Sequence, residues 1–125
     1  MKKLDKDMVL LIHQLIGEQT GGSIGIRDMN LLDSALESVF ATFGGKDLYP
    51  TKEEKGARLG YNLISNHAFI DGNKRIGVHI MVLFPALNGI ELFYTEKELL
   101  NVGVSVGAGQ MSYEQLLAWV RSKMK

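Results

Sequence analysis

The chain contains no cysteine and only two prolines among its 125 residues. The lack of cysteine excludes disulfides, thiolate metal sites and thiol nucleophiles together, and it suits the reducing cytoplasm, where we expect the protein to act. Basic and acidic residues balance at 14 each, so no overall charge attracts DNA or an acidic membrane. Any phosphate-bearing partner must therefore be bound by a local site.

Long apolar runs are also missing. The N-terminal run VLLI is too short for a membrane span and follows acidic residues, so we expect neither a signal peptide nor membrane attachment. Hydrophobic residues make up 46% of the chain and charged residues 22%, which is typical of a folded globular protein. We expect a single domain covering residues 1–125.

Signals for helix starts recur along the sequence. Polar residues that can cap a helix precede apolar positions at helical spacing, and three of them form capping boxes with Glu or Gln three residues later. They are Asp5, Asp28 and the pairs Thr51–Glu54, Thr95–Glu98 and Ser112–Gln115. With a further apolar stretch after residue 75, these signals predict about six helices and an all-α fold.

The segments between the helices are short. FGGKDLYP is expected to form a loop, and IELFY at 90–94 a short extended piece. Pro85 lies inside the helical stretch that ends at Asn88-Gly89. Because proline removes a backbone donor, we expect a kink or an irregular last turn there, and its effect on activity is open.

A polar segment, HAFIDGNKR at 67–75, separates two apolar helical stretches. Its Asp-Gly-Asn turn directly precedes a helical pattern, which predicts backbone N–H groups gathered at a helix N-terminus, where anions bind. Gly72 would let a phosphate approach the backbone closely. Lys74 and Arg75 place positive charges in a first turn that otherwise favours acidic residues, so a polyphosphate ligand would suit this position.

The same segment offers the remaining parts of a phosphoryl- or nucleotidyl-transfer site. Asp71 is a suitable Mg²⁺ ligand, because Mg²⁺ in phosphate sites takes one or two carboxylates plus phosphate oxygens. His67 can accept the proton of an attacking hydroxyl. Phe69 is better interpreted as an anchor that packs the loop onto the core than as a substrate contact.

Each of these features alone is common in proteins that do not transfer phosphoryl or nucleotidyl groups. Their occurrence in this order within nine residues is what favours a transfer site. The other histidines, His13 and His79, fall within helical patterns and are expected to be structural or surface residues. Three scattered histidines do not supply a zinc site.

HAFIDGNKR resembles the signature of the Fic/Doc superfamily, His-x-Phe-x-Asp/Glu-Gly-Asn-x-Arg, at all six specified positions. GIRDMNLLDSAL before it and LFPALNG after it are similar to the compact Doc (death-on-curing) branch. The resemblance implies a Fic/Doc-like all-α fold and a toxin of a toxin–antitoxin pair. It also implies transfer of the γ-phosphate of ATP, with Mg²⁺, to a Ser or Thr of a protein substrate, a translation elongation factor being one implied target.

The resemblance also assigns roles to residues of the segment. His67 would be the general base, Asp71 the Mg²⁺ ligand, and Arg75 the group that holds a phosphate and stabilises transition-state charge. The anion site would be lined by Gly72, Asn73, Lys74 and Arg75.

Two alternatives remain open. Fic enzymes that transfer AMP typically have Gly where Lys74 stands, so Lys74 favours the kinase, whereas Gly72 matches the Fic form and keeps adenylylation in play. A catalytically idle module that binds an antitoxin is the second alternative. A toxicity test of His67→Ala would separate it from the enzymes.

The resemblance further implies a Phd-like antitoxin as partner. Related proteins are often inhibited by a helix with the pattern Ser/Thr-x-x-x-Glu-Gly/Asn, and no Ser or Thr here has Glu four residues later. We therefore expect inhibition by a separate chain. DNA binding by the protein itself is not expected, because no helix carries a basic face.

Overall fold

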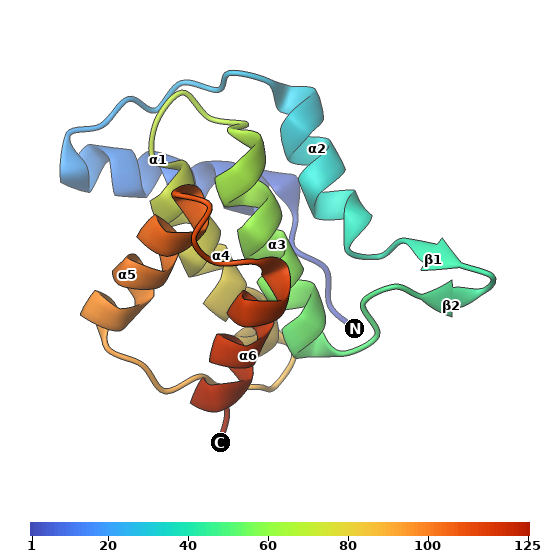
Figure 1. Ribbon diagram of the computed structural model, residues 1–125. Coiled ribbons are helices and arrows are strands. Elements are labelled where there is room, and N and C mark those ends of the chain that lie inside the picture. Colours follow the sequence, from blue (N-terminus) through green and yellow to red (C-terminus); the bar gives the residue numbers. More distant parts are fainter.

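Five of the six helices begin at a polar side chain that accepts hydrogen bonds from first-turn amides, as the sequence predicted. The computed structural model describes residues 1–125 and is all-α apart from one small hairpin (Figure 1). The helices are α1 (Lys6–Thr20), α2 (Met29–Ser38), α3 (Lys52–Asn66), α4 (Asn73–Leu87), α5 (Glu96–Gly107) and α6 (Tyr113–Lys123). The exception is α4, which follows Gly72 and has no side-chain cap.

Helices α3 and α4 form the central pair of the fold. Glycines bring their backbones together: a Cβ at Gly60 would lie 2.8 Å from Cβ of Met81, and one at Gly77 would lie 3.0 Å from the carbonyl oxygen of Gly60. One hydrophobic core joins this pair to α1 and α2, and a second joins it to α5 and α6, so the pair separates the two cores (Figure 1). The polar segment 67–72 is the connection between these two central helices.

Of the two short segments between helices that the sequence singled out, one differs from the prediction and the other agrees with it. The stretch expected as a loop forms a hairpin, β1 (Thr42–Phe43) and β2 (Lys46–Asp47), whose two-residue turn has positive φ at Gly44 and Gly45. Glycine pairs favour this tight turn because they adopt positive φ without a steric penalty. The segment 90–94 is extended as expected, and its Leu92 forms an isolated bridge with Met124.

Pro85 does not end α4, which continues to Leu87. The proline ring occupies space beside Gly56 of α3, where a Cβ would lie 2.8 Å from Cγ of Pro85. No helix of the molecule combines the length and apolarity that crossing a membrane requires.

Candidate active site

The candidate site begins where α3 ends. His67 follows the last residue of α3 with φ 54° and ψ 49°, and it is the one non-glycine residue with positive φ in the chain. That conformation costs of order 1 kcal/mol or more and persists only where the surroundings hold it. Arg27 supplies part of this support: its Nε donates to the carbonyl oxygen of His67 (2.6 Å) and its Nη2 to that of Asn66 (3.0 Å). The His67 side chain is exposed.

The backbone after His67 is paired with the segment between α1 and α2. The amides of Arg27 and Asp28 donate to the carbonyl oxygen of Ala68 at 2.9 and 3.0 Å, and the amide of Ile70 donates to that of Gly25 at 3.1 Å. These bonds fix the loop on its outer edge. Arg27 lies within the GIRDMNLLDSAL stretch, but no local pattern indicates its contact with His67, because the two are separated by 40 positions.

A buried histidine supports the loop from below. The ring of His13 in α1 stacks on Phe69, with centroids 3.7 Å apart and an interplanar angle of 15°. Its Nε2 donates to the backbone carbonyl oxygen of Asp71 at 2.7 Å. Both side chains are almost fully buried. His13 is therefore structural, but it belongs to the site because it holds the peptide of Asp71 directly.

Asn73 closes the loop on itself. Its Nδ2 donates to the carbonyl oxygen of Phe69 (2.9 Å), and its Oδ1 accepts from the amide of Phe69 (3.1 Å). The side chain is buried. Asn73 thus contributes a fixed loop shape and its backbone N–H to the start of α4.

The first turn of α4 has the features of an anion-binding position. The amides of Asn73, Lys74 and Arg75 have no acceptor within the protein, and the turn contains no acidic residue. Gly72, with φ 79°, precedes them, and its amide donates to Oδ1 of Asp71 at 2.8 Å. Free amides at a helix N-terminus, together with two exposed cationic side chains, favour a phosphate group.

These groups share one cavity of about 330 Å³. Its lining consists of His67, Ile70, Asp71, Gly72, Asn73, Lys74 and Arg75. The structure thus brings together every residue that the sequence assigned to the site except Phe69, which lies beneath the loop.

A second polar cavity, also about 330 Å³, lies on the α1 side of the same loop. Asp71, Gly72 and Arg75 line both cavities, and the Gly21-Gly22-Ser23 turn after α1 forms the opposite wall. A Cβ at Gly22 would lie 2.8 Å from Oδ2 of Asp71, so a larger residue there would displace the Asp71 carboxylate. Asp71 thus lines a cavity on each side of the loop.

No group of three His, Asp or Glu side chains gathers anywhere in the molecule to bind a metal ion. A divalent cation at Asp71 would accordingly need oxygen ligands from a bound phosphate compound, which is the way Mg²⁺ is usually held beside nucleotides. The residues present fit that arrangement: one carboxylate lies beside free amides, and Lys74 and Arg75 are exposed in the same turn.

Comparison with known proteins agrees with this geometry. A model of the Fic/DOC family matches residues 3–85, from the start of the chain to near the end of α4. Over 89 residues the chain is 42% identical to a protein named Toxin Doc from Mycolicibacterium smegmatis (strain ATCC 700084 / mc(2)155). The match covers 71% of this chain and 66% of that protein, so the chain spans just under two thirds of its relative's length. The matched region contains the whole loop and every residue that shapes it, and the chain therefore belongs to the Fic/DOC family.

Proposed function

We propose that this protein is the toxin of a toxin–antitoxin pair and transfers the γ-phosphate of MgATP to a serine or threonine hydroxyl of a protein target. A cytoplasmic translation elongation factor is the target class implied by the resemblance. The observation that carries the proposal is the shared cavity, which His67 lines together with Lys74, Arg75 and the free amides of α4. The name of the relative, Toxin Doc, supports the toxin role.

The positions suggest a role for each group. The exposed imidazole of His67 would accept the proton of the attacking hydroxyl. Asp71 would hold Mg²⁺ together with phosphate oxygens, and bound MgATP would supply the phosphoryl group and the positive charge of the metal. Arg75 and the free amides of α4 would stabilise negative charge on the group being transferred.

The position of Lys74 favours γ-phosphate transfer over AMP transfer. Its methylene chain lies over α5, where a Cβ at Gly107 would be 2.6 Å from Cε of Lys74. A lysine at the edge of the cavity adds a positive charge that would change which phosphates of ATP can occupy the amides. AMP transfer remains the second candidate because Gly72 has the form found in adenylylating relatives.

A Phd-like antitoxin is the partner that we propose from the same resemblance. Co-expression provides the test: a cognate antitoxin should relieve growth arrest caused by the wild-type chain and should co-purify with both the wild-type chain and His67→Ala. Growth arrest by His67→Ala as strong as that by the wild type would contradict the enzymatic proposal and support the idle binding module.

The reaction is tested with ATP labelled at the γ-phosphate in one sample and at the α-phosphate in another, using purified protein, Mg²⁺ and an extract of the source cells. We expect label on a protein band from γ-labelled ATP only. His67→Ala should abolish it. His79→Ala is the matched control, because His79 lies in α4 outside the cavity and contacts Glu96 at 3.8 Å.

Label from the α position would identify an AMP transferase and overturn the argument from Lys74. Label transfer that persists in His67→Ala would contradict the assignment of His67 as the general base. Transfer that is unaffected by chelation of Mg²⁺ would contradict the role of Asp71.

A further inference from the structure

A groove between α2 and α3 extends to Asn66, the residue before His67, and shares no lining residue with the cavity of the candidate active site. It has a volume of about 500 Å³ and runs along one face of α3, from the base of the hairpin to the C-terminal end of the helix. Its polar lining includes Ser34 and Ser38 of α2 and Arg58, Asn62, Ser65 and Asn66 of α3. The last of these directly precedes His67, so the groove ends beside the candidate general base.

Arg58 is the only charged residue in this α2–α3 groove. Its guanidinium forms neither an ion pair nor a hydrogen bond with any other residue. Instead it lies among the rings of Tyr49, Tyr61 and Tyr113, at 5.5, 5.3 and 5.2 Å from their centroids. Aromatic rings hold a guanidinium by cation–π attraction while leaving its N–H donors unused.

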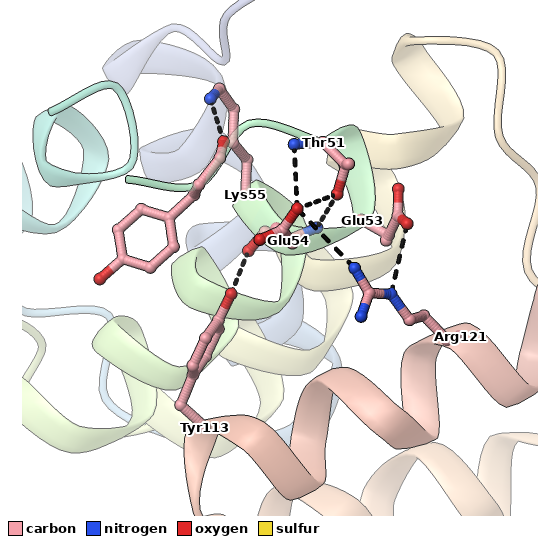
Figure 2. Close-up of polar contacts among 7 residues, drawn as sticks. Thr51, Glu53, Glu54, Lys55, Tyr113 and Arg121 are labelled. Atoms are coloured by element: carbon pink, nitrogen blue, oxygen red, sulfur yellow. Dashed lines mark hydrogen bonds and ion pairs between the residues drawn. The ribbon is translucent and has the colours of Figure 1, made fainter. Parts of the chain in front are cut away.

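The position of these rings is fixed by the contact between α3 and α6. The hydroxyl of Tyr113 donates to the backbone carbonyl oxygen of Glu54 at 3.2 Å, as Figure 2 shows. Tyr113 also packs edge-on against Tyr49 and Tyr61. Arg58 is therefore held by a built aromatic cage and is not a free surface side chain.

The acidic residues closest in sequence to Arg58 are engaged elsewhere. Figure 2 shows the guanidinium of Arg121 between Glu53 and Glu54, at 3.4 and 3.7 Å. Asp47 of the hairpin pairs with the buried Lys55 at 3.5 Å. The groove thus presents an unneutralised cation within a molecule whose net charge is zero, and the complementary ligand is a carboxylate.

The length of the groove sets the spacing of such a ligand. Arg58 and Asn66 are eight residues apart on α3, which corresponds to about 12 Å along the helix axis. An extended peptide covers that distance in about four residues. Serine and asparagine side chains along the way can bind the backbone of such a peptide.

We infer that the α2–α3 groove binds an extended segment of the protein target and that Arg58 recognises an Asp or Glu about four residues from the modified hydroxyl. The inference names the substrate class of the proposed function and rests on it. Recognition of this kind selects targets by sequence around the hydroxyl, in addition to the hydroxyl itself.

The test is a set of fluorescent peptides with one central serine in a Gly/Ala background and a single Asp moved along both sides of it. Binding to the His67→Ala protein is measured by fluorescence anisotropy without ATP. We expect Asp at three to five positions on one side of the serine to tighten binding about fivefold, the gain of one partly exposed ion pair.

Arg58→Gln should remove this gain, and Arg58→Lys should retain part of it. Lys97→Gln is the matched control and should leave the gain unchanged, because Lys97 is an exposed residue of α5 that lies outside the groove and forms no ion pair. Thermal unfolding of each variant shows whether the fold is intact. Equal binding of every peptide, or an Asp preference that survives in Arg58→Gln, would overturn the inference. Because binding is read without ATP, it is judged separately from label transfer, and failure of one does not imply failure of the other.

Discussion

At the scale of single residues, the loop 67–72 is held in shape by residues that lie outside it. His13 holds the carbonyl oxygen of Asp71 and stacks on Phe69, while Arg27 holds the carbonyl oxygens before and at His67. The candidate base and the candidate metal ligand are thus each fixed by a residue from the first 27 positions. Reactivity of the loop should depend on both.

The first prediction concerns His13→Phe. This change keeps an aromatic ring against Phe69 but removes the donor to Asp71, leaving a carbonyl acceptor unpaired. We expect the free energy of unfolding to fall by about 1–3 kcal/mol and label transfer to fall at least tenfold, because small displacements of catalytic groups have large rate effects. Urea unfolding and the labelling assay measure the two quantities.

His79→Phe is the matched control, because His79 contacts no residue of the loop and only approaches Glu96. It should leave label transfer near the wild-type level. Full activity of a folded His13→Phe protein would show that Asp71 does not need this support.

The sequence singled out the residues that line the candidate site but not the residues that position them. All six signature positions fall within one nine-residue stretch, so a local pattern reveals them. The bond of His13 spans 58 positions and that of Arg27 spans 40, and nothing local marks either partner. A single buried histidine on a helical face looks the same whether it packs in the core or holds a loop.

At the scale of secondary-structure elements, helix α5 provides the surface on which Lys74 lies. Gly103 and Gly107 are one turn apart and face Lys74. A Cβ at Gly103 would contact the backbone oxygen of Lys74 at 3.4 Å, and one at Gly107 would approach its Cε. The glycines therefore leave room for the lysine chain along the helix.

The second prediction is that Gly107→Ala alters which phosphate of ATP is transferred without changing any charge. The added methyl would force the end of the Lys74 side chain to move, while the helix should be as stable or up to about 1 kcal/mol more stable. We expect γ-phosphate transfer to fall severalfold and the ratio of α- to γ-label on the target to rise. An unchanged ratio would mean that the position of Lys74 does not select the phosphate.

The third prediction concerns the contact between α3 and α6. Burial raises the pKa of Tyr113 to about 12, assisted by the nearby Glu54 and Tyr49. Well below pH 10 this tyrosine is neutral in the folded and unfolded states alike, so it has no effect there on the pH dependence of stability. Between pH 10 and 12 the unfolded chain loses the proton first, and stability therefore falls as pH rises.

Tyr113→Phe tests this sign. Phenolate absorbance of the native wild type should include a titration near pH 12 that the variant lacks. Between pH 10 and 12 the midpoint of urea unfolding should decline more steeply for the wild type than for Tyr113→Phe. Parallel declines would mean that Tyr113 ionises equally well in both states.

The elements themselves were predicted well because their start signals are local. Each capping box involves residues three positions apart, and all three that the sequence predicted are formed. The hairpin was missed although its Gly44-Gly45 turn was visible, because strands of two residues carry too little alternation to indicate a strand.

For Pro85 the sequence predicted a kink or an irregular last turn. The helix continues to Leu87, and its end is closed by bonds from the amides of Asn88 (3.0 Å) and Ile90 (2.8 Å) to the carbonyl oxygen of Pro85. The space beside Gly56 that accommodates the ring depends on another helix and was not visible in the sequence.

At the scale of the whole molecule, the site depends on how closely two helices approach. The loop connects α3 to α4, and His67 and Asn73 belong to the two ends of that connection. Any change in the separation of these helices moves His67 relative to the free amides at the start of α4. The close approach depends on Gly60 and Gly77, where a Cβ would meet backbone atoms at 3.1 and 3.0 Å.

The fourth prediction is that Gly60→Ala lowers both stability and activity. Alanine would favour the isolated helix by up to about 1 kcal/mol, but its methyl would meet Cβ of Met81 and a backbone oxygen, neither of which can rotate away. Overpacking of this kind costs about 1–3 kcal/mol, so we expect a net loss of stability, measured by urea unfolding.

Gly107→Ala is the control: it also lies within a helix, but only the flexible end of a lysine side chain is in its way, so it should show no such loss. Because the forced separation of α3 and α4 acts directly on the loop, label transfer by the folded fraction of Gly60→Ala should fall as well. A Gly60→Ala protein as stable and as active as the wild type would show that the distance between the central helices does not set the geometry of the site.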